Sequence, residues 1–294
     1  MKKNIKTIVI SLITVFGLIG IVSLINSYSR MVTFHQTNTF IIDEQFPDTN
    51  GTLVLNYHQV EDNESTAKLS ADLQVYNISI ERFEEHMRYI SENNINVLTL
   101  DQLQTKIKTK NFSDRSVVIT FDDIDQSVYT NAFPILQKYN IPFCLFIVTS
   151  KPGTIDDERQ YATWEQIIEM SNSGLATIGI HTNNLHYKVN GAPIFLDKNN
   201  IKQFETDLQA SINIYNQYLH EKPKYFAYPY GYGIPETDKL LMDNGIELIF
   251  SLESGLVTET TEKFFIPRLL INEGNEQYAS SWVSNEDTTI ISSS

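Results

Sequence analysis

Short apolar runs alternate with helical patterns along the chain from about residue 51 to residue 271. Continuous apolar runs are typical of strands that are buried on both faces, whereas apolar residues three or four apart are typical of helices. The alternation repeats about seven times and predicts a parallel sheet with helices packed outside it. If such a sheet closes into a barrel, the carboxyl ends of its strands meet on one face.

The pattern also predicts where individual elements begin and end. Two capping boxes, Thr99 with Gln102 and Thr163 with Gln166, each open a helix. Residues 61–78 are polar, and we expect a loop there. The expected strands are 52–57, 94–98, 117–123, 141–149, 175–180, 225–228, 247–251 and 265–271. The other expected helices are 79–93, 126–139 with an interruption near Pro134, 199–219 and 235–245.

The N-terminal 30 residues have the features of a targeting segment. Residues 7–25 form a mostly apolar stretch without charge, and three lysines precede it. At ~1.5 Å per residue, this stretch spans about 28 Å, close to the thickness of a bilayer core. Lysines on this side predict that the body lies outside the cell. We expect residues 1–30 to be a membrane anchor or a signal segment, and residues 31–50 a spacer. The body is then anchored at the extracellular face of the membrane or secreted.

The charge of the body excludes some partners. The chain carries 22 Lys and Arg and 36 Asp and Glu, a formal charge of −14. Leaving out residues 1–30, which contain four bases and no acid, the remainder has a charge of −18. Such a body would be repelled by nucleic acid. The single cysteine, Cys144, excludes an intrachain disulfide and a cysteine zinc cluster, and its apolar surroundings indicate a buried structural role.

Candidate chemistry begins where the apolar run 117–121 ends on two adjacent carboxylates, Asp122 and Asp123. One carboxylate can bind a metal while the other handles a proton. The alternative is a solvated acidic turn. His58, His181 and Tyr230 also lie at or just after expected strand carboxyl ends, which would meet on one face of a barrel. This coincidence predicts an active site there.

His181 and His186 can bind one metal ion only if a loop carries them. His181 and His186 are five residues apart, which places them on opposite faces of a strand and rotates them by ~140° on a helix. With one aspartate, they make an open set of two imidazoles and one carboxylate. The alternative is two unrelated surface histidines. His58 has the right ordinary pKa to protonate a leaving group, although a lone histidine after a strand can also be structural.

Aromatic residues near these positions are candidates for substrate binding. The faces of Tyr228 and Tyr230 suit sugar rings, and the backbone N–H of Tyr230 could face an oxyanion. The alternative is an ordinary Pro/Gly turn whose tyrosines pack on the core. Trp164 could flank a pocket or pack its own helix.

These motifs resemble those of the polysaccharide deacetylases, carbohydrate esterase family 4. The resemblance is carried by Thr-Phe-Asp-Asp at 120–123, by the two histidines, and by Tyr-Pro-Tyr-Gly at 228–231, and it covers about residues 50–272. Three features resemble those of one branch of the family. They are the five-residue separation of the histidines, Ala227 where other branches carry arginine, and His58 ahead of the aspartates in the sequence. That branch comprises the exported poly-β-1,6-N-acetylglucosamine deacetylases of biofilm formation, the intercellular adhesion protein B type.

The resemblance implies an α/β fold, a distorted (β/α) barrel of the polysaccharide deacetylase (NodB-homology) type. We expect the deacetylase domain at 51–280, and the polar residues 281–294 indicate a tail. The resemblance also implies one divalent metal ion, zinc first and cobalt, nickel or iron otherwise, with Asp123, His181 and His186 as ligands. Asp122 would be the general base and His58 the general acid.

One departure from the family concerns the residue that controls the pKa of the general base. The family arginine near the general base is missing here, and Ile124 stands after Asp123 where the branch often has glycine. Arg268, in Ile-Pro-Arg at 266–268, is a candidate substitute. The alternative is that Arg268 is a surface charge at a strand end.

The implied activity is hydrolysis of N-acetyl groups on an extracellular N-acetylglucosamine polymer. Two alternatives remain open: a deacetylase of β-1,4 glycans such as peptidoglycan or chitin, and a non-catalytic protein that binds a cell-surface polysaccharide. The expected partners are the polymer, the bacterial membrane through the N-terminal segment, and an exopolysaccharide synthase complex.

Overall fold

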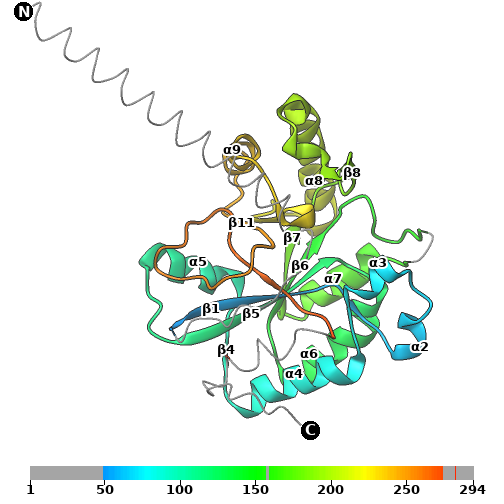
Figure 1. Ribbon diagram of the computed structural model, residues 1–294, viewed down its shortest axis with the longest axis vertical. Coiled ribbons are helices and arrows are strands. Elements are labelled where there is room, and N and C mark those ends of the chain that lie inside the picture. The colour runs from blue at the N-terminus through cyan, green and yellow to red at the C-terminus, as the bar shows by residue number, and fades with distance from the viewer. Residues whose placement is uncertain (1–48, 157–158, 274–281, 283–294) are drawn as a thin grey trace, which may run out of the picture.

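The computed structural model describes residues 49–156, 159–273 and Trp282. Its centre is an eight-stranded sheet in the order β11-β10-β7-β6-β5-β1-β12, with β4 paired beside the first half of β5 (Figure 1). Every pair of neighbours in this sheet is parallel, as the alternation of strands and helices predicts. The strands are β1 (Gly51–Tyr57), β4 (Asn96–Val97), β5 (Arg115–Asp123), β6 (Phe143–Ile147), β7 (Ala176–Ile180), β10 (Tyr225–Ala227), β11 (Leu248–Phe250) and β12 (Leu269–Leu270).

The two edges of the sheet approach each other through the chain that precedes β12. Phe250 of β11 forms a parallel bridge with Ile266, and β12 then pairs with β1. The sheet is therefore curled toward a barrel and closed on this side by a short, irregular connection. The expected strand 265–271 is shortened to two residues, and Phe265 has a positive φ of 60°. That conformation interrupts a strand at this position.

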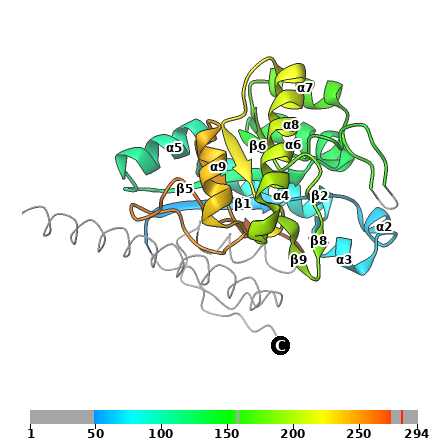
Figure 2. The same cartoon turned by 90° about the horizontal axis from the view of Figure 1, so that it is seen from above.

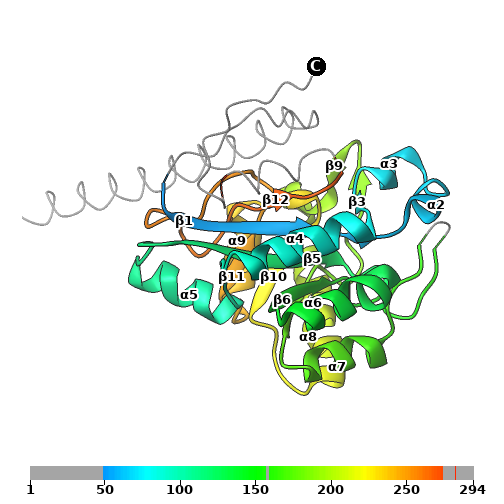
Figure 3. The same cartoon turned by 90° about the horizontal axis from the view of Figure 1, so that it is seen from below.

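Helices surround the sheet in the order in which they follow the strands. α4 packs on α6, η1 on α7, α7 on α8, and α8 on α9. Figures 2 and 3 show α5 at one end of the molecule, and α2 (Asn63–Thr66) and α3 (Ala71–Gln74) at the other. The helices are α4 (Ile80–Glu92), α5 (Leu100–Thr109), η1 (Val128–Ala132), α6 (Phe133–Tyr139), α7 (Trp164–Asn172), α8 (Ile201–Leu219) and α9 (Pro235–Asp243).

Both predicted capping boxes are present, at the N-termini of α5 and α7. The predicted interruption near Pro134 is also present, because η1 is a π-helix in which the Phe133 N–H bonds Val128. Proline lacks the N–H that an α-helix needs at this point. The expected loop at 61–78 was wrong in part. It contains α2 (Asn63–Thr66), α3 (Ala71–Gln74) and β3 (Asn77–Ile78), and β3 pairs with β2 (Gln59–Val60).

A second small sheet is the hairpin of β8 (Lys188–Val189) and β9 (Ala192–Pro193), which lies after the histidine loop. Short single-turn helices follow β9 and β10. They are η2 (Ile194–Leu196), η3 (Lys198–Asn200) and η4 (Pro229–Gly231).

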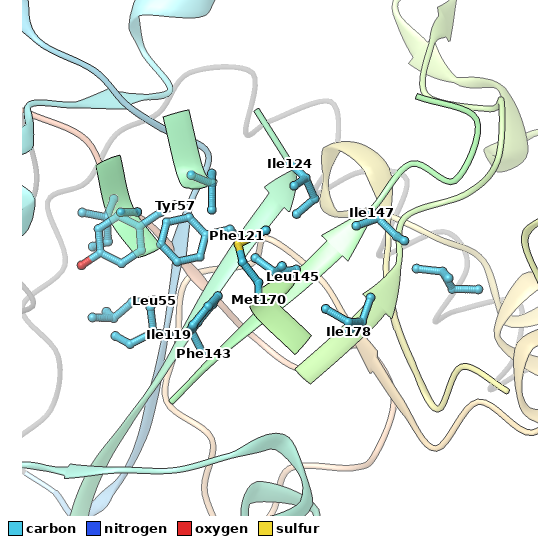
Figure 4. Packing of buried hydrophobic residues seen from close by; sticks show 14 of the residues in the cluster. Leu55, Tyr57, Ile119, Phe121, Ile124, Phe143, Leu145, Ile147, Met170 and Ile178 are labelled. Atoms are coloured by element: carbon cyan, nitrogen blue, oxygen red, sulfur yellow. The ribbon is translucent and has the colours of Figure 1, made fainter. Parts of the chain in front are cut away.

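The buried side chains form two clusters, one on each face of the sheet. Residues such as Tyr57, Phe121 and Leu145 lie in the larger cluster beneath the outer helices (Figure 4). The alternate positions of the same strands, such as Val118 and Phe146, belong to the second cluster. Side chains alternate between the faces of a strand, so Thr120 and Asp122 continue the second face of β5. Cys144 is buried in this cluster, as expected from its apolar surroundings.

The proposed anchor at 1–30 and nearly all of the spacer lie outside the described residues. Within the described ranges, no helix is both long and apolar enough to cross a membrane. Of the expected polar tail, only Trp282 is described. Its side chain is buried, and Arg115 lies over its ring at 5.2 Å from the ring centroid.

Candidate active site

Three candidate residues are brought together by the register of neighbouring strands. The β1–β5 pairing ends at Tyr57 opposite Phe121, so the next residues, His58 and Asp122, leave the two strands at the same level. β7 lies on the other side, after β6, and His181 is the first residue beyond it. The parallel sheet thus gathers residues that are far apart in sequence at its carboxyl edge.

A γ-turn separates the roles of the two aspartates. The Ile124 N–H donates to the Asp122 carbonyl at 2.7 Å, and φ is 65° at Asp123 and 68° at Ile124. Positive φ is uncommon and costly for residues other than glycine, and functional sites are among the places where it recurs. In a regular strand, Asp123 would face the side opposite to Asp122. The turn instead brings its carboxylate to the histidines.

Asp123, His181 and His186 form a group that could hold a metal ion. Asp123 Oδ1 lies 3.7 Å from His181 Nε2 and 3.1 Å from His186 Nε2. One ligand atom from each of the three residues lies within 4.8 Å of the others. This is the set that the sequence predicts, and within the described ranges no other group of three such residues has this arrangement.

The donor chemistry of this set fits a divalent metal ion. His181 Nδ1 lies 2.7 Å from the Ala227 carbonyl oxygen, to which it donates when neutral, leaving Nε2 as the donor to an ion. Asp123 Oδ1 is buried and faces the Nε2 atoms of His181 and His186, and it has no other hydrogen-bond partner within the described residues. One carboxylate oxygen and two imidazole nitrogens that face one another are donors that suit a divalent ion such as zinc.

The loop that carries His186 is held by α8. The N–H groups of Asn183 and Asn184 donate to the two carboxylate oxygens of Asp207 at 2.8 and 2.7 Å. Thr182 has a positive φ of 71°, which turns the chain directly after His181. These features explain how two histidines five residues apart face one point, as the sequence required of a loop.

Asp122 is paired with Arg268. The guanidinium donates to both carboxylate oxygens at 2.7 Å and to the Ser251 carbonyl at 2.8 Å. Arg268 is 0% exposed and Asp122 is 1% exposed, so the alternative of a surface charge is wrong. Burial alone would raise the pKa of Asp122, but the Arg268 guanidinium outweighs it and lowers the pKa to about 2. The carboxylate is therefore ionised at neutral pH.

A second arginine, Arg159, contacts Asp123 and was not anticipated from the sequence. Its guanidinium lies 2.8 Å from Asp123 Oδ2, the oxygen that does not face His186. Burial would raise the pKa of Asp123, but His186 and then Arg159 hold that pKa well below its usual range. Arg159 lies in a polar loop whose sequence has no pattern that points to the site.

His58 is buried near both aspartates. Its ring centroid lies 4.9 Å from that of Tyr76, and its Nδ1 has no hydrogen-bond partner among the described residues. Burial lowers the pKa of His58, and the charges of Asp122 and Asp123 oppose this effect. A substrate or solvent that satisfies Nδ1 would complete this environment.

Tyr230 lies at the site, as expected. Its ring centroid is 4.9 Å from that of His186, and Lys188 Nζ lies 4.5 Å from its ring. Its backbone has a positive φ of 61°, and the following Gly231 has φ 83°. A side chain on Gly231 would approach Leu252 within 2.4 Å, so the tight turn requires glycine.

The structure contradicts two expected substrate contacts. Tyr228 is 0% exposed, and its hydroxyl lies 2.6 Å from Thr237 Oγ1 and donates to Asp238 at 2.8 Å. Trp164 is buried and stacks on Tyr218 with ring centroids 4.3 Å apart. Both side chains therefore pack the core, which is the alternative that the sequence left open for each. The strand before Tyr228 is only three residues long, so the alternation of its side chains could not predict whether Tyr228 faces the core or a pocket.

Comparison with known proteins gives a consistent result. The family described as polysaccharide deacetylase matches residues 109–249, a range that excludes His58 and Arg268. The chain is 31% identical over 244 residues to a poly-β-1,6-N-acetyl-D-glucosamine N-deacetylase of Staphylococcus epidermidis, covering 80% of this chain and 84% of that protein. It is 32% identical over 241 residues to the protein of the same name in Staphylococcus aureus, covering 76% and 80%.

Solved structures show the same fold. The structure of IcaB from Ammonifex degensii has a TM-score of 0.73 at 31% identity, over 80% of this chain and 97% of that one. A de-N-acetylase from Aggregatibacter actinomycetemcomitans has a TM-score of 0.67 at 24% identity, over 79% and 99%. The predicted distorted barrel of the deacetylase type is thereby confirmed.

Proposed function

The chain belongs to the polysaccharide deacetylase family and is an amide-bond hydrolase, and from this premise we propose that it removes N-acetyl groups from extracellular poly-β-1,6-N-acetyl-D-glucosamine. The proposal includes dependence on one divalent metal ion, zinc first and cobalt, nickel or iron otherwise. The products are acetate and a polymer that carries free amines.

One observation carries the proposal. Asp123, His181 and His186 converge on one point beside Asp122, which is held separately by Arg268. The two adjacent carboxylates thus have different partners: Asp123 faces two histidines and Arg159, whereas Asp122 is held by Arg268. Metal-assisted hydrolysis of an amide uses such a division between a Lewis-acid site and a base.

The three ligands would hold the ion, and when bound it would supply a Lewis acid for the amide carbonyl and a lowered pKa of water, from ~15.7 toward ~7. Asp122 accepts the proton from the attacking water, and Arg268 keeps it ionised and oriented for this task. The backbone N–H of Tyr230 stabilises negative charge on the carbonyl oxygen. His58 donates a proton to the amine nitrogen as the carbon–nitrogen bond breaks.

The similar staphylococcal proteins support the β-1,6-linked polymer as the substrate, because they are named as deacetylases of that polymer. Tyr230, partly exposed beside His186, offers an aromatic face to a sugar ring. A free amine on the product is cationic at neutral pH, so deacetylation changes the charge of the polymer.

The place of action is proposed from the N-terminal segment. A stretch of 19 uncharged residues after three lysines supports a body at the extracellular face of the membrane, anchored or secreted. A polymer made and exported at that membrane would be the partner, and its synthase complex would lie nearby.

Acetate release from β-1,6-linked and β-1,4-linked N-acetylglucosamine oligomers tests the substrate, with metal content measured on the same samples. We expect release from the β-1,6 oligomers, and its loss in Asp122→Asn. Release from the β-1,4 oligomers alone would show that the substrate is a peptidoglycan-like or chitin-like glycan. A wild-type chain that binds polymer but releases no acetate with added Zn²⁺ or Co²⁺ would be a non-catalytic binder.

A further inference from the structure

The chain just after His58 is held by the loop that follows the two aspartates. Gln59 Nε2 donates to Asp125 Oδ2 at 3.3 Å, and the Val60 N–H donates to Ser127 Oγ at 3.1 Å. These bonds join β2, which begins one residue after His58, to the chain that carries the aspartate pair. They continue the β1–β5 connection beyond the point where its backbone pairing ends.

Asp125 is itself fixed in place. Its Oδ1 accepts from the Ser127 N–H at 2.8 Å, and its backbone forms an antiparallel bridge with Tyr161. An aspartate that bonds the N–H two residues later is a common turn at the start of a helix. That ordinary role accounts for Oδ1 and leaves the bond from Gln59 to Oδ2 unexplained.

Gln59 has no such ordinary role. Its side chain is 2% exposed, and its Oε1 has no hydrogen-bond partner among the described residues. Burying an amide with one of its polar atoms unpaired costs about 1–3 kcal/mol, and an apolar side chain would avoid that cost. The bond to Asp125 is therefore the contact that holds the side-chain amide of Gln59.

His58 needs such support, because no hydrogen bond orients its ring through Nδ1 in the described structure. In histidines that act as acids or bases, a bond at one nitrogen usually fixes the ring for transfer at the other. Here the orientation depends on the backbone next to His58 and on the ring contact with Tyr76.

We propose that Gln59 and Asp125 are a positioning pair whose hydrogen bond holds the imidazole of His58 at the level of Asp122. The pair acts on the chain on either side of the reaction centre: Gln59 directly follows the acid, and Asp125 lies three residues after the base. This inference rests on the proposed function, because it assigns the pair to a reaction in which His58 is the acid.

The first test uses Gln59→Leu, which removes both polar atoms of the amide and keeps the size of the side chain. We expect kcat/KM to fall about 10-fold, mainly through kcat, with metal content unchanged, because a displaced proton donor slows the bond-breaking step. Added to His58→Ala, the same substitution should cause no further loss. Losses that multiply in the double variant would overturn the inference, since independent sites are additive in free energy.

Variants of Asp125 separate the two roles of that carboxylate. Asp125→Asn keeps an acceptor for Ser127, and its amide can bond the Gln59 side chain after that side chain rotates. It should retain activity within about 3-fold of wild type, whereas Asp125→Ala should match the 10-fold loss of Gln59→Leu. A full loss in Asp125→Asn would assign the effect to charge and would contradict the pair.

A matched control and a second readout complete the test. Thr52→Val removes a buried hydrogen bond of 2.8 Å to Ser116 at the opposite end of β1, and should leave kcat/KM within about 2-fold. NMR of the histidine rings in the full chain, with the His58 signal assigned by His58→Gln, reports the ring without any substrate. A His58 signal unmoved by Gln59→Leu refutes the inference even if the oligomers are not the substrate. An inactive wild type with a shifted His58 signal refutes only the proposed function.

Discussion

The guanidinium of Arg268 binds both carboxylate oxygens of Asp122, at 2.7 Å each, across a separation of 146 residues in the sequence. The pair is buried among aromatic rings, with the guanidinium carbon 5.3 Å from the Phe146 ring centroid. A buried cation thus lies beside the proposed base, although this chain has alanine at position 227. The arginine comes from the position directly before β12 and not from the aromatic loop.

The Arg268 pair should be needed for both stability and activity. In Arg268→Gln, the Asp122 charge stays buried without its partner, and breaking a buried pair from one side costs about 3–5 kcal/mol. Urea unfolding measures this loss. Arg82→Gln is the control, because Arg82 forms a pair with Glu85 in which both side chains are about half exposed, and it should change stability by less than about 1 kcal/mol.

Arg268→Lys tests the geometry of the pair. Lysine retains the charge but cannot donate to both oxygens in one plane. We expect a folded protein whose kcat is lower by about 10-fold or more, measured by acetate release. Wild-type kcat in this variant would show that charge alone is sufficient.

The two aspartates should respond differently to substitution. Asp123→Ala removes a ligand and should abolish stoichiometric metal binding. Asp122→Asn leaves the three ligands in place, so it should keep the metal while kcat falls by about 10²–10⁴. Elemental analysis and acetate release on the same samples compare the two. Equal metal loss in both variants would mean that Asp122 is also a ligand.

Removal of the metal should lower thermal stability as well as activity. An ion that binds only the folded chain stabilises it, so a chelator should lower Tm, and added Zn²⁺ should restore it. In Asp123→Ala, the chelator should leave Tm unchanged. A similar Tm shift in this variant would place the ion elsewhere. Thermal unfolding followed by circular dichroism measures these shifts without any substrate.

His86 should make stability depend on pH. Burial lowers its pKa to about 4 in the folded chain, against an ordinary value of 6.5. Between pH 4 and pH 6.5, His86 binds more protons in the unfolded chain than in the folded one. The free energy of unfolding is therefore not reduced by His86 above pH 6.5, and it falls as the pH drops toward 4. From pH 7 to pH 5, wild type should lose on the order of 1 kcal/mol more than His86→Gln. Urea unfolding at the two pH values measures this difference, and equal losses would contradict it.

The elements and most of the chemistry were readable locally. Capping boxes at Thr99 and Thr163 and the apolar run before Asp122 depend on residues within a few positions of one another, so the sequence predicted them. The adjacent aspartates and the two histidines were recognisable for the same reason. Of the elements in 61–78, β3 was missed because it forms by pairing with β2, and α2 and α3 were missed because four residues are too few for a periodic pattern.

The roles of single side chains were decided by the tertiary structure. Whether Arg268 is a surface charge or the partner of Asp122 depends on a strand pairing that brings distant residues together. The γ-turn at Asp123, the contact from Arg159 and the burial of Tyr228 depend equally on neighbours from other elements. The sequence by itself determined which chemical groups are available and at which strand ends they lie. Only the folded sheet decided which groups meet, because parallel pairing joins strands through long connections that no local pattern specifies.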